Sequence, residues 1–564
     1  MGELRSSNEY DELIRWAESQ GGYCSPSLVI TKSETSGSTA YAKTEIAGPN
    51  TRLLSCPTSL IIDYDKAAAH IWGDPHACPF LRSPQIAIRL FLCNQRILGC
   101  DSPWAAYIKL LPTEFDTPLY YSHDEMEMLR GTNVFGEVEL RRHAWVEEWK
   151  RGVMYLPSKF NKTLFSWELY LWACTVLSSR SFPSSIVFGT SKDDSYPVLV
   201  PLVDSLNHKP QVPVYWSATA DSFTISSGNS IAAGDEVFNN YGPKGNEELL
   251  MGYGFCLEDN AFDVVTLKLR HPRMSFDKAE LVSSEMTESI FHLSQSSPLP
   301  HDLVNFFRIV VANAHETQRL LALRTVPPLS KTAGMRCELD ALGKLCNAVS
   351  MKLRGISVTG VANPNMRQRS MKVYISQQAK ILSQSLLAIT RAMYEALRIQ
   401  PESPDTEDIT FLSKKVYEHL PDCGVNLDLI FTSPRFAEFT SAIKQGFDVS
   451  SPSDIRAADI EDQILVLFVS HLLISAPAEY AAWLDAMHER YNNDEELNED
   501  YVEDFERLFD TYIPPLAELN SNIFGEQKWT PRVMAWAGKI VDSEGVVVEN
   551  CENGRPEYWI ITAV

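Results

Sequence analysis

Two short stretches of the sequence carry side chains that could bind and act on a small molecule. Asn207 and His208 end an apolar segment, 198–206, and offer an amide and an imidazole to a ligand. Tyr241 precedes Gly242 where a strand-like stretch ends, and a glycine lets a ligand approach the backbone closely. Taken singly, a buried Asn-His pair is more often a satisfied structural pair, and such a tyrosine is more often an aromatic plug. Together they indicate a small-molecule pocket with a tyrosine at its centre.

The elements that must position these residues form a β region that is split in the sequence. Short apolar stretches between Gly, Ser and Pro turns predict strands at 28–30, 40–42, 52–55, 197–203, 212–216, 222–226 and 236–239. A short opening helix before Gly21 precedes them. Between Tyr64 and Ser179 the pattern is helical, with several proline breaks. We therefore predict a β domain that closes near residue 270 and contains a helical insertion at about 65–180.

The rest of the chain has a helical texture. Five apolar residues between Leu382 and Leu397 recur at steps of 4, 3, 4 and 4, an amphipathic stripe that is typical of packing between helices. Similar patterns predict helices near 302–324, 335–353, 406–420, 435–446, 461–475 and 478–491. The acidic run 492–510 is typical of a solvated helix face or loop. The predicted fold class is α+β, with a first domain over 1–270 and an all-helical second domain over 271–564.

Composition limits the partners and the compartment. The 564 residues include 73 acidic and 50 basic residues, a net charge of −23, which disfavours a nucleic-acid backbone or an anionic membrane as the main partner. This acidity favours a basic partner, although solubility alone accounts for it equally well. The 11 cysteines show no zinc-ligand spacing, so no metal site or disulfide framework is indicated and a reducing compartment is expected, cytoplasmic or nuclear. The longest apolar run, Ile464 to Val469, is too short to span a membrane.

Three separated segments share their order and residue types with a known family. Asp204 to His208 contains the Asn-His pair, and Gly234 to Asp263 contains Gly-Asp-Glu-x-Phe-x-Asn-Tyr-Gly, a helix and Tyr-Gly-Phe. Ser102 to Pro112 looks like that family's helical insertion. The combination resembles the SET-domain protein methyltransferases, and most of all the branch of the Rubisco large-subunit and ribosomal-protein lysine methyltransferases. The motifs cover 1–270, and the helical remainder is similar in kind to that branch's C-terminal substrate-binding domain.

The resemblance implies a cofactor, S-adenosylmethionine, and roles for individual residues. Tyr241 would be the catalytic tyrosine and Tyr253 a wall of the lysine channel, while Asp204 and Tyr215 would belong to the substrate pocket. The implied cofactor-binding residues are Ser36, Gly37, Ser38, Arg180, Asn207 and His208. No metal is implied, since this branch lacks the zinc-binding module that follows other SET domains.

Two positions depart from the family pattern. The first cofactor motif usually reads Gly-x-Gly, whereas this chain has Thr39 at the second glycine. If that backbone needs a positive φ, a β-branched residue is costly, and a weaker affinity for the cofactor is expected. Ser184 stands near Arg180 where the plant enzymes carry another basic residue, so a different choice of substrate is expected.

The implied function is that of an S-adenosylmethionine-dependent protein-lysine N-methyltransferase. Its expected substrate is a basic protein, such as a ribosomal protein, an elongation factor or a histone, with no direct contact to nucleic acid or membrane, and the expected state is a monomer. Two alternatives stay open: transfer to histidine on the same fold, and a non-catalytic SET-fold binding scaffold. The width and polarity of the pocket would separate lysine from histidine, and binding of the cofactor would separate an enzyme from a scaffold.

Overall fold

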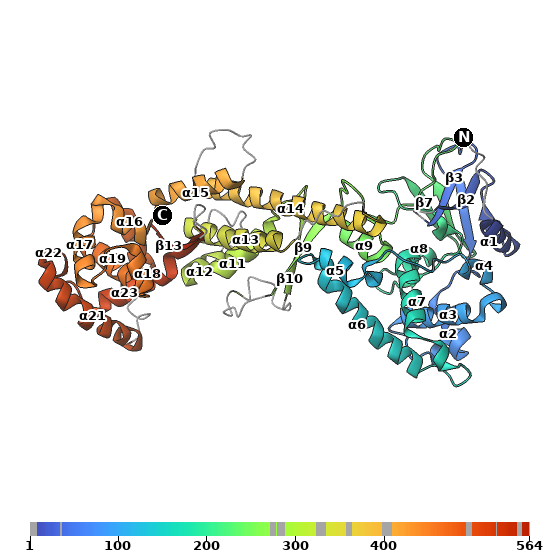
Figure 1. Ribbon diagram of the computed structural model, residues 1–564, viewed down its shortest axis with the longest axis horizontal. Coiled ribbons are helices and arrows are strands. Elements are labelled where there is room, and N and C mark those ends of the chain that lie inside the picture. The colour runs from blue at the N-terminus through green and yellow to red at the C-terminus, as the bar shows by residue number, and fades with distance from the viewer. Residues whose placement is uncertain are drawn as a thin grey trace. The chain divides into compact units, whose positions relative to one another are not determined.

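The chain forms two compact units. The computed structural model describes residues 8–33, 37–270, 278, 288–322, 334–356, 364–397, 409–491, 499–525, 527–549 and 555–562. The first unit comprises residues 1–264, blue to green in Figure 1, and 355–378, drawn yellow, and the second comprises 265–354 and 379–564. The sequence predicts a border near residue 270, and the structure also groups 355–378 with the first unit.

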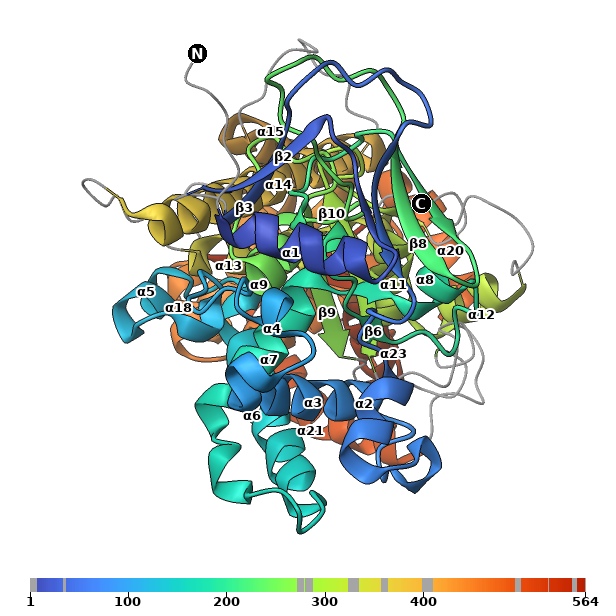
Figure 2. The same ribbon diagram turned by 90° about the vertical axis from the view of Figure 1, so that its right-hand side faces the viewer.

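Small antiparallel sheets build the β part of the first unit, as the α+β prediction requires. Figure 2 shows strands β2, β3 and β8 toward the top of this unit and helices α2, α3 and α6 below them. The four-stranded sheet has the order β1 (Tyr23–Cys24), β4 (Arg52–Pro57), β8 (Ser222–Ser227), β7 (Val214–Ala218). Two further pairs are β2 (Leu28–Ser33) with β3 (Gly37–Ala42), and β5 (Phe182–Pro183) with β6 (Pro197–Val198). Burial alternates along β8, where Phe223 and Ile225 are fully buried, as expected for a strand with one face on the core.

Two predicted strands are shorter than expected. After β6 the chain turns at Leu202, whose φ is 72°, into a 3₁₀ turn over Val203–Ser205. The stretch 236–239 makes only isolated bridges, because Val237 donates its N–H to Ala40 and Asn239 donates to Asn207. The stretch 236–239 thus pairs first with β3, at Ala40, and then with the segment at Asn207.

Six helices lie between β4 and β5, in the stretch for which the sequence predicts an insertion. They are α2 (Tyr64–Trp72), α3 (Pro84–Leu98), α4 (Ala105–Ile108), α5 (His123–Met128), α6 (Asn133–Met154) and α7 (Trp167–Arg180). Helix α3 is buried along 86–95, and α6 approaches it closely at Gly152, where a Cβ would lie 3.2 Å from Leu90. Ser166 caps α7 by accepting the N–H of Leu169, and the last residue of this helix is Arg180.

Residues 355–378 are fastened to the first unit by polar contacts. They include the first part of α14 (Met366–Ala396). Arg367 binds the Asp116 carboxylate at 2.8 Å and donates to the carbonyl of Phe115 at 3.0 Å. Tyr374 donates to Glu247, which lies in α9 (Asn246–Tyr253). The helix that carries Tyr253 is therefore held by a segment far away in the sequence.

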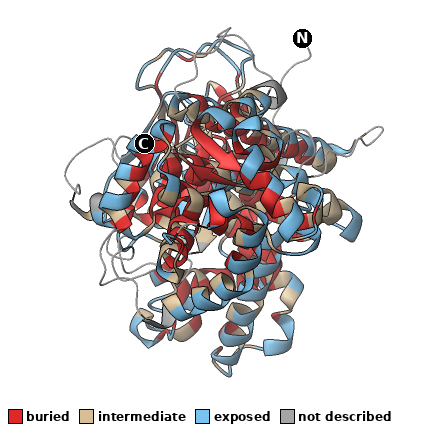
Figure 3. Ribbon diagram, turned by 90° about the vertical axis from the view of Figure 1, so that its left-hand side faces the viewer, coloured by how far each residue is buried: buried red, intermediate tan, exposed pale blue. Residues whose placement is uncertain are grey.

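The second unit is mostly helical, with a core built around α19 (Glu461–Ser475). Residues 464–469 of this helix are all buried, and Figure 3 shows buried stretches in red. The other helices are α11 (His301–Val311), α12 (Ala314–Ala322), α13 (Met335–Gly355), α15 (Ile409–Cys423), α16 (Leu427–Thr432), α17 (Ala437–Gly446), α18 (Pro452–Ala457), α20 (Ala481–Tyr491), α21 (Glu499–Leu519), α22 (Ser521–Phe524) and α23 (Pro531–Glu544). In the described part of the chain no single helix is long and apolar enough to cross a membrane, and one bent pair, α19 with the stretch 478–491, passes by length and composition.

The prediction of an all-helical second domain is wrong. Strands β11 (Gly424–Asn426), β13 (Pro556–Ile561) and β12 (Gly545–Glu549) form an antiparallel sheet in this order, and β9 (Val264–Arg270) pairs with β10 (Glu288–Ser294). Three consecutive valines in β12 and the run Tyr-Trp-Ile-Ile in β13 favour strands, because branched and aromatic side chains pack well on a pleated surface. Trp559 is buried in this sheet.

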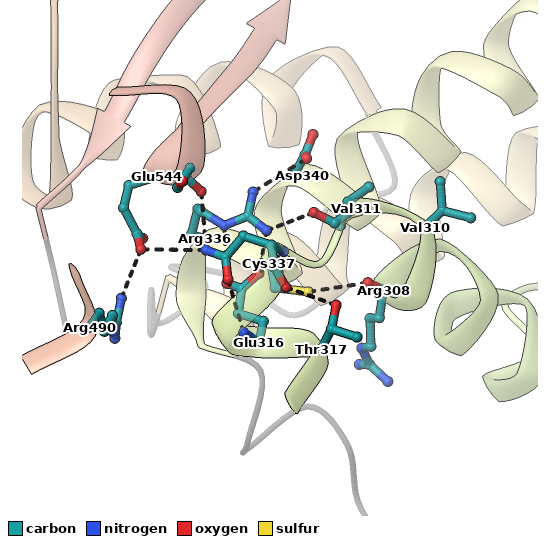
Figure 4. Close-up of polar contacts among 12 residues, drawn as sticks. Arg308, Val310, Val311, Glu316, Thr317, Arg336, Cys337, Asp340, Arg490 and Glu544 are labelled. Carbon is teal, nitrogen blue, oxygen red and sulfur yellow. Dashed lines mark hydrogen bonds and ion pairs between the residues drawn. The ribbon is translucent and has the colours of Figure 1, made fainter. Parts of the chain in front are cut away.

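A network of buried charges joins the helices of the second unit (Figure 4). Arg336 of α13 binds Glu316 of α12 through two nitrogens, at 3.0 and 2.5 Å, and donates to the carbonyl of Val311. Glu544, at the end of α23, accepts from Arg490 at 3.1 Å and from Tyr491. Buried charges are tolerated only when they are paired in this way, so these contacts fix which helices lie together.

Candidate active site

Two chain segments that are distant in the sequence cross at the centre of the first unit. The N–H of Asn239 donates to the carbonyl of Asn207 at 2.8 Å, and the N–H of Lys209 donates to the carbonyl of Asn239 at 3.0 Å. This pairing brings Tyr241 next to His208. The N–H of Tyr241 donates to His208 Nδ1 at 3.0 Å, and its hydroxyl donates to the Leu206 carbonyl at 2.8 Å. Tyr241 is therefore held both at its backbone N–H and at its hydroxyl.

Three aromatic rings stack in a row at this crossing. The centroids of His208 and Tyr241 lie 4.8 Å apart with an interplanar angle of 17°, and those of Tyr241 and Tyr253 lie 5.1 Å apart at 24°. Burial raises the pKa of both tyrosines well above the usual range, so both phenols are neutral at physiological pH. These rings make a rigid wall that carries one oriented hydroxyl, that of Tyr241.

His208 is neutral and has one unused donor. Burial, together with the nearby charge of Lys244, lowers its pKa to about 4. Because Nδ1 accepts the N–H of Tyr241, the proton of the neutral ring lies on Nε2. His208 is 8% exposed, and its Nε2 is buried without a hydrogen-bond partner among the described residues. A buried donor without a partner is rare in folded proteins and suggests a missing ligand.

Tyr241 and Tyr253 line a cavity of about 350 Å³. Its walls are residues 178–183, 195–197, Asp204, Trp216, Asn239, Tyr241, Lys244 and Tyr253. This volume is in the range of pockets that hold small molecules or single side chains. Its lining combines aromatic rings with a few polar groups, which suits the apolar stem and polar end of a long side chain.

An ion pair closes one side of the cavity. Arg180 lies 3.5 Å from the Asp204 carboxylate and donates to the Asp204 carbonyl at 3.1 Å. Tyr107, which lies within the 102–112 segment, donates to the same carboxylate at 2.7 Å. Burial raises the pKa of Asp204, while Arg180 and Tyr107 oppose that rise. The two charges balance each other, and sequence reasoning missed Tyr107 as their third partner.

Comparison with known proteins identifies the family. A scan of protein-family models gives no match. The ribosomal lysine N-methyltransferase set10 of Schizosaccharomyces pombe is 31% identical over 533 residues, which cover 90% of this chain and 91% of that protein. The chain belongs to the SET-domain protein-lysine N-methyltransferases.

Two further proteins are similar over most of their length. The protein-lysine N-methyltransferase EFM1 of Saccharomyces cerevisiae is 22% identical over 95% of this chain and 96% of its own. A solved structure of Rubisco LSMT bound to AdoMet has the same fold, with a TM-score of 0.59 and 24% identity over 70% of this chain and 93% of that one. The family predicted from the three motifs is therefore confirmed, and the scaffold alternative is not supported.

The residues that the SET resemblance assigns to the cofactor lie on neighbouring segments, except Ser36, which is outside the described residues. Gly37 opens β3 with a φ of 68°, and a Cβ built there would have no neighbour within 4 Å. Ser38 donates its hydroxyl to the Ser205 carbonyl at 2.9 Å, which joins this hairpin to the segment that leads to Asn207. These contacts bring Gly37, Ser38, Asn207 and His208 into one region of the SET unit.

The concern about backbone strain at Thr39 is removed by the structure. Among the described residues of β3, only Gly37 has a left-handed φ, while Thr39 pairs with Thr31 as an ordinary strand residue. Its side chain is buried, and its hydroxyl accepts from Asn207 Nδ2 at 3.3 Å. The threonine thus supports Asn207 by a contact that a glycine could not make.

Tyr215 is not brought to the cavity of this SET enzyme. Its side chain is 50% exposed, whereas the next residue, Trp216, lines the cavity and donates Nε1 to Asn239 at 3.1 Å. Successive residues of a strand point to opposite faces, so Trp216 faces this cavity and Tyr215 does not. Ser184 is also not a surface residue, because it is 2% exposed and bonds with the backbone of Tyr196.

Among the described residues, no three His, Cys, Asp or Glu side chains gather closely enough to hold a metal ion. Lys244 and Trp216 line the cavity but are absent from the sequence-based assignment. Alternation along β7 places Trp216 and Tyr215 on opposite faces but does not say which of the two faces the cavity. No sequence signal singled out Lys244, because a lysine before a helix is most often solvated.

Proposed function

We propose that this enzyme transfers a methyl group from S-adenosylmethionine to the side-chain amine of a lysine in a ribosomal protein. The family shown by the comparison establishes protein-lysine N-methylation as the activity. The ribosomal substrate is inferred from set10, which is named for it. The net charge of −23 supports this choice, since ribosomal proteins that bind RNA are basic. The observation that carries the proposal is Tyr241, with its hydroxyl fixed at the wall of a cavity that fits a lysine side chain.

The residues near His208 fit the cofactor. The orphaned Nε2–H of His208 is a donor that a bound polar group would satisfy. Asn207 directs its Nδ2 to Glu236 at 2.9 Å and to Thr39, which leaves its Oδ1 to accept a hydrogen bond. The open backbone at Gly37 lets a ligand approach closely. S-adenosylmethionine supplies a methyl group activated by a sulfonium, and Gly37, Ser38, Arg180, Asn207 and His208 would hold it.

Positioning is the main contribution of the protein to this reaction. The nitrogen lone pair of lysine forms a bond to the methyl carbon as the carbon–sulfur bond breaks, and the nitrogen loses one proton overall. Aligning donor, acceptor and leaving group can supply several kcal/mol of the rate enhancement. The Tyr241 hydroxyl stays protonated and donates a hydrogen bond to the Leu206 carbonyl, so its oxygen is free to accept a hydrogen bond from the amine and orient it. Tyr253 confines the aliphatic stem and limits how many methyl groups fit.

The second unit is proposed to bind the substrate protein, by analogy with the C-terminal domain of the branch that the chain resembles. Its mixed helix and sheet structure differs from the all-helical expectation but leaves this role intact. An acidic chain that attracts a basic substrate should bind it more weakly as salt rises, because exposed charges are screened beyond roughly 8 Å at physiological ionic strength. KM should then rise with salt while kcat changes little.

The test is incubation with labelled cofactor. The wild-type protein is mixed with ribosomal subunits, and the modified residue is identified by mass spectrometry. A labelled lysine is expected, and a labelled histidine would instead support the alternative acceptor. Tyr241→Phe should lower the rate by at least ~100-fold, in the range of a lost catalytic contact.

Tyr121→Phe is the matched control. It also removes a buried tyrosine hydroxyl from the first unit, but one without a hydrogen-bond partner among the described residues. This variant should methylate normally. A Tyr241→Phe protein that methylates at the wild-type rate would contradict the assignment of Tyr241.

A further inference from the structure

Lys244 is a cation in the wall of the acceptor cavity. It lies between the strand end at Tyr241 and the start of α9, and its side chain is only 21% exposed. Its Nζ lies 5.8 Å from the centroid of the Tyr253 ring, and that ring stacks on Tyr241. The ammonium therefore lies near the Tyr253 ring, which in turn stacks on the ring of Tyr241, whose hydroxyl orients the acceptor.

The counter-ion of Lys244 points into solvent. Lys244 forms an ion pair with Glu248, one turn along α9, and the Glu248 side chain is 58% exposed. Water screens an exposed charge much more strongly than a half-buried one. The ammonium of this pair lines the cavity, whereas its carboxylate lies mostly in solvent.

The other charged groups around the cavity balance each other or are neutral. Arg180 is paired with Asp204. Glu236 accepts from Asn207, and His208 is neutral at physiological pH because its pKa is about 4. The phenols of Tyr107, Tyr241 and Tyr253 all have pKa values raised by burial. Lys244 is therefore a cavity-lining cation whose carboxylate partner does not itself line the cavity.

We propose that Lys244 favours the neutral form of the acceptor lysine, with Glu248 moderating its effect. Lysine arrives as an ammonium ion and must lose a proton before its lone pair can attack. A like charge nearby disfavours the charged form, so Lys244 shifts bound lysine toward the reactive amine. Lys244 acts through space on the acceptor and is a positioning residue. This inference rests on the proposed function and adds the group that helps prepare its substrate.

The test compares two variants that change the charge in opposite directions. Lys244→Met keeps an apolar stem and removes the cation, whereas Glu248→Gln removes the moderating anion. Single-turnover methylation of the ribosomal acceptor is measured at saturating substrate between pH 6 and 10. The midpoint of the acid limb should move up by roughly half a pH unit in Lys244→Met and down by a similar amount in Glu248→Gln. In the pH profile of kcat/KM, the midpoint that reports the ionisation of unbound substrate lysine should be the same in all variants, because kcat/KM reflects the free enzyme and the free substrate.

Lys150→Met is the matched control. Lys150 forms a similar pair with Glu147 at 2.7 Å, but on the exposed surface of α6, and should leave the midpoint unchanged. A purely structural loss at Lys244 would lower the rate at every pH without moving the midpoint, which would overturn the inference. Midpoints that move in the same direction in both cavity variants would also overturn it. Absence of wild-type labelling would instead contradict the proposed function, so the two failures are distinguishable.

Discussion

Asp263 is expected to make the stability of the α9 region depend on pH. Its Oδ1 accepts from the N–H groups of Asn246 and Val264 at 2.9 and 3.1 Å, and its Oδ2 accepts from Asn246 Nδ2 at 3.2 Å. Burial nevertheless outweighs these bonds and raises the pKa of Asp263 to about 6. The folded pKa lies above the unfolded value, so the stability that this group contributes is complete below pH 4 and is lost as pH rises through 6.

The size of the effect follows from the shift. A rise of about two pKa units corresponds to ~3 kcal/mol between the protonated and ionised limits. Asp263→Asn cannot ionise and should abolish this pH dependence, but it turns an amide N–H₂ toward Asn246 Nδ2 at a cost of about 1–3 kcal/mol. The variant should therefore be less stable than the wild type at pH 4 and nearly equal to it, or more stable, at pH 8.

The measurement is amide hydrogen exchange of the 246–264 segment from pH 4 to 8, corrected for intrinsic rates. Exchange reports this region alone, which matters because a chain of two units need not unfold in one step. Asp221→Asn, which changes an exposed carboxylate at the β7–β8 turn, serves as the control and should follow the wild type. If Asp263→Asn also ran parallel to the wild type across this range, the argument from burial would be refuted.

Two further predictions concern the walls of the site. Trp216→Ala should lower kcat/KM at least about tenfold, because it removes a wall of the cavity. The kcat/KM of Tyr215→Ala should stay within about twofold of the wild-type value, because Tyr215 is exposed and does not line the cavity. Equal losses of kcat/KM in steady-state assays of the two variants would instead support a role for Tyr215 in the site. Thr39→Gly should raise the Kd for S-adenosylmethionine about fivefold, equivalent to ~1 kcal/mol, because it removes the contact with Asn207 and loosens a strand. Thr39→Ser keeps the hydroxyl and should bind normally, and calorimetry showing tighter binding by Thr39→Gly would contradict the role given to the threonine.

The sequence predicts which residues lie together better than it predicts their contacts. Asn207, His208 and Tyr241 are recognised because their order and spacing match a family motif. That the N–H of Tyr241 bonds to His208 Nδ1 depends on the pairing of Asn239 with Asn207, which no local pattern reveals. Motif matching therefore finds which residues meet but not how they are held.

The errors at single positions arise from register and environment. Tyr215 and Trp216 are both aromatic, and only the pairing of β7 with β8 decides which of them faces the cavity. The sequence predicts strain at Thr39 because the family motif has a glycine at that position, although in β3 the structure needs a positive φ at Gly37 alone. The charge of Lys244 acquires a function only because the Tyr253 ring lies beside it. The environment of each of these residues depends on neighbours that its own residue type does not reveal.

The fold shows a similar division between local and long-range information. Periodicity finds long helices such as α13, because its apolar residues repeat with the turn of the helix. It misses β12 and β13, which are short and stand among helices, although their valines and aromatic residues favour strands. Short strands take their identity from a partner, and the partner of β11 lies more than a hundred residues later.

Which chain segments make up the first unit also depends on contacts between residues that are distant in the sequence. A border at residue 270 separates every SET motif from the rest, yet 355–378 supplies Arg367 to the 115–120 loop and Tyr374 to Glu247. Gln378 also donates to the carbonyl of Val264, directly after Asp263. Without these partners Glu247 would lose a hydrogen bond at the start of the helix that ends in Tyr253. The wall of the cavity that Tyr253 lines therefore depends on a segment outside the three motifs, and the first unit must be defined by its contacts as well as by its motifs.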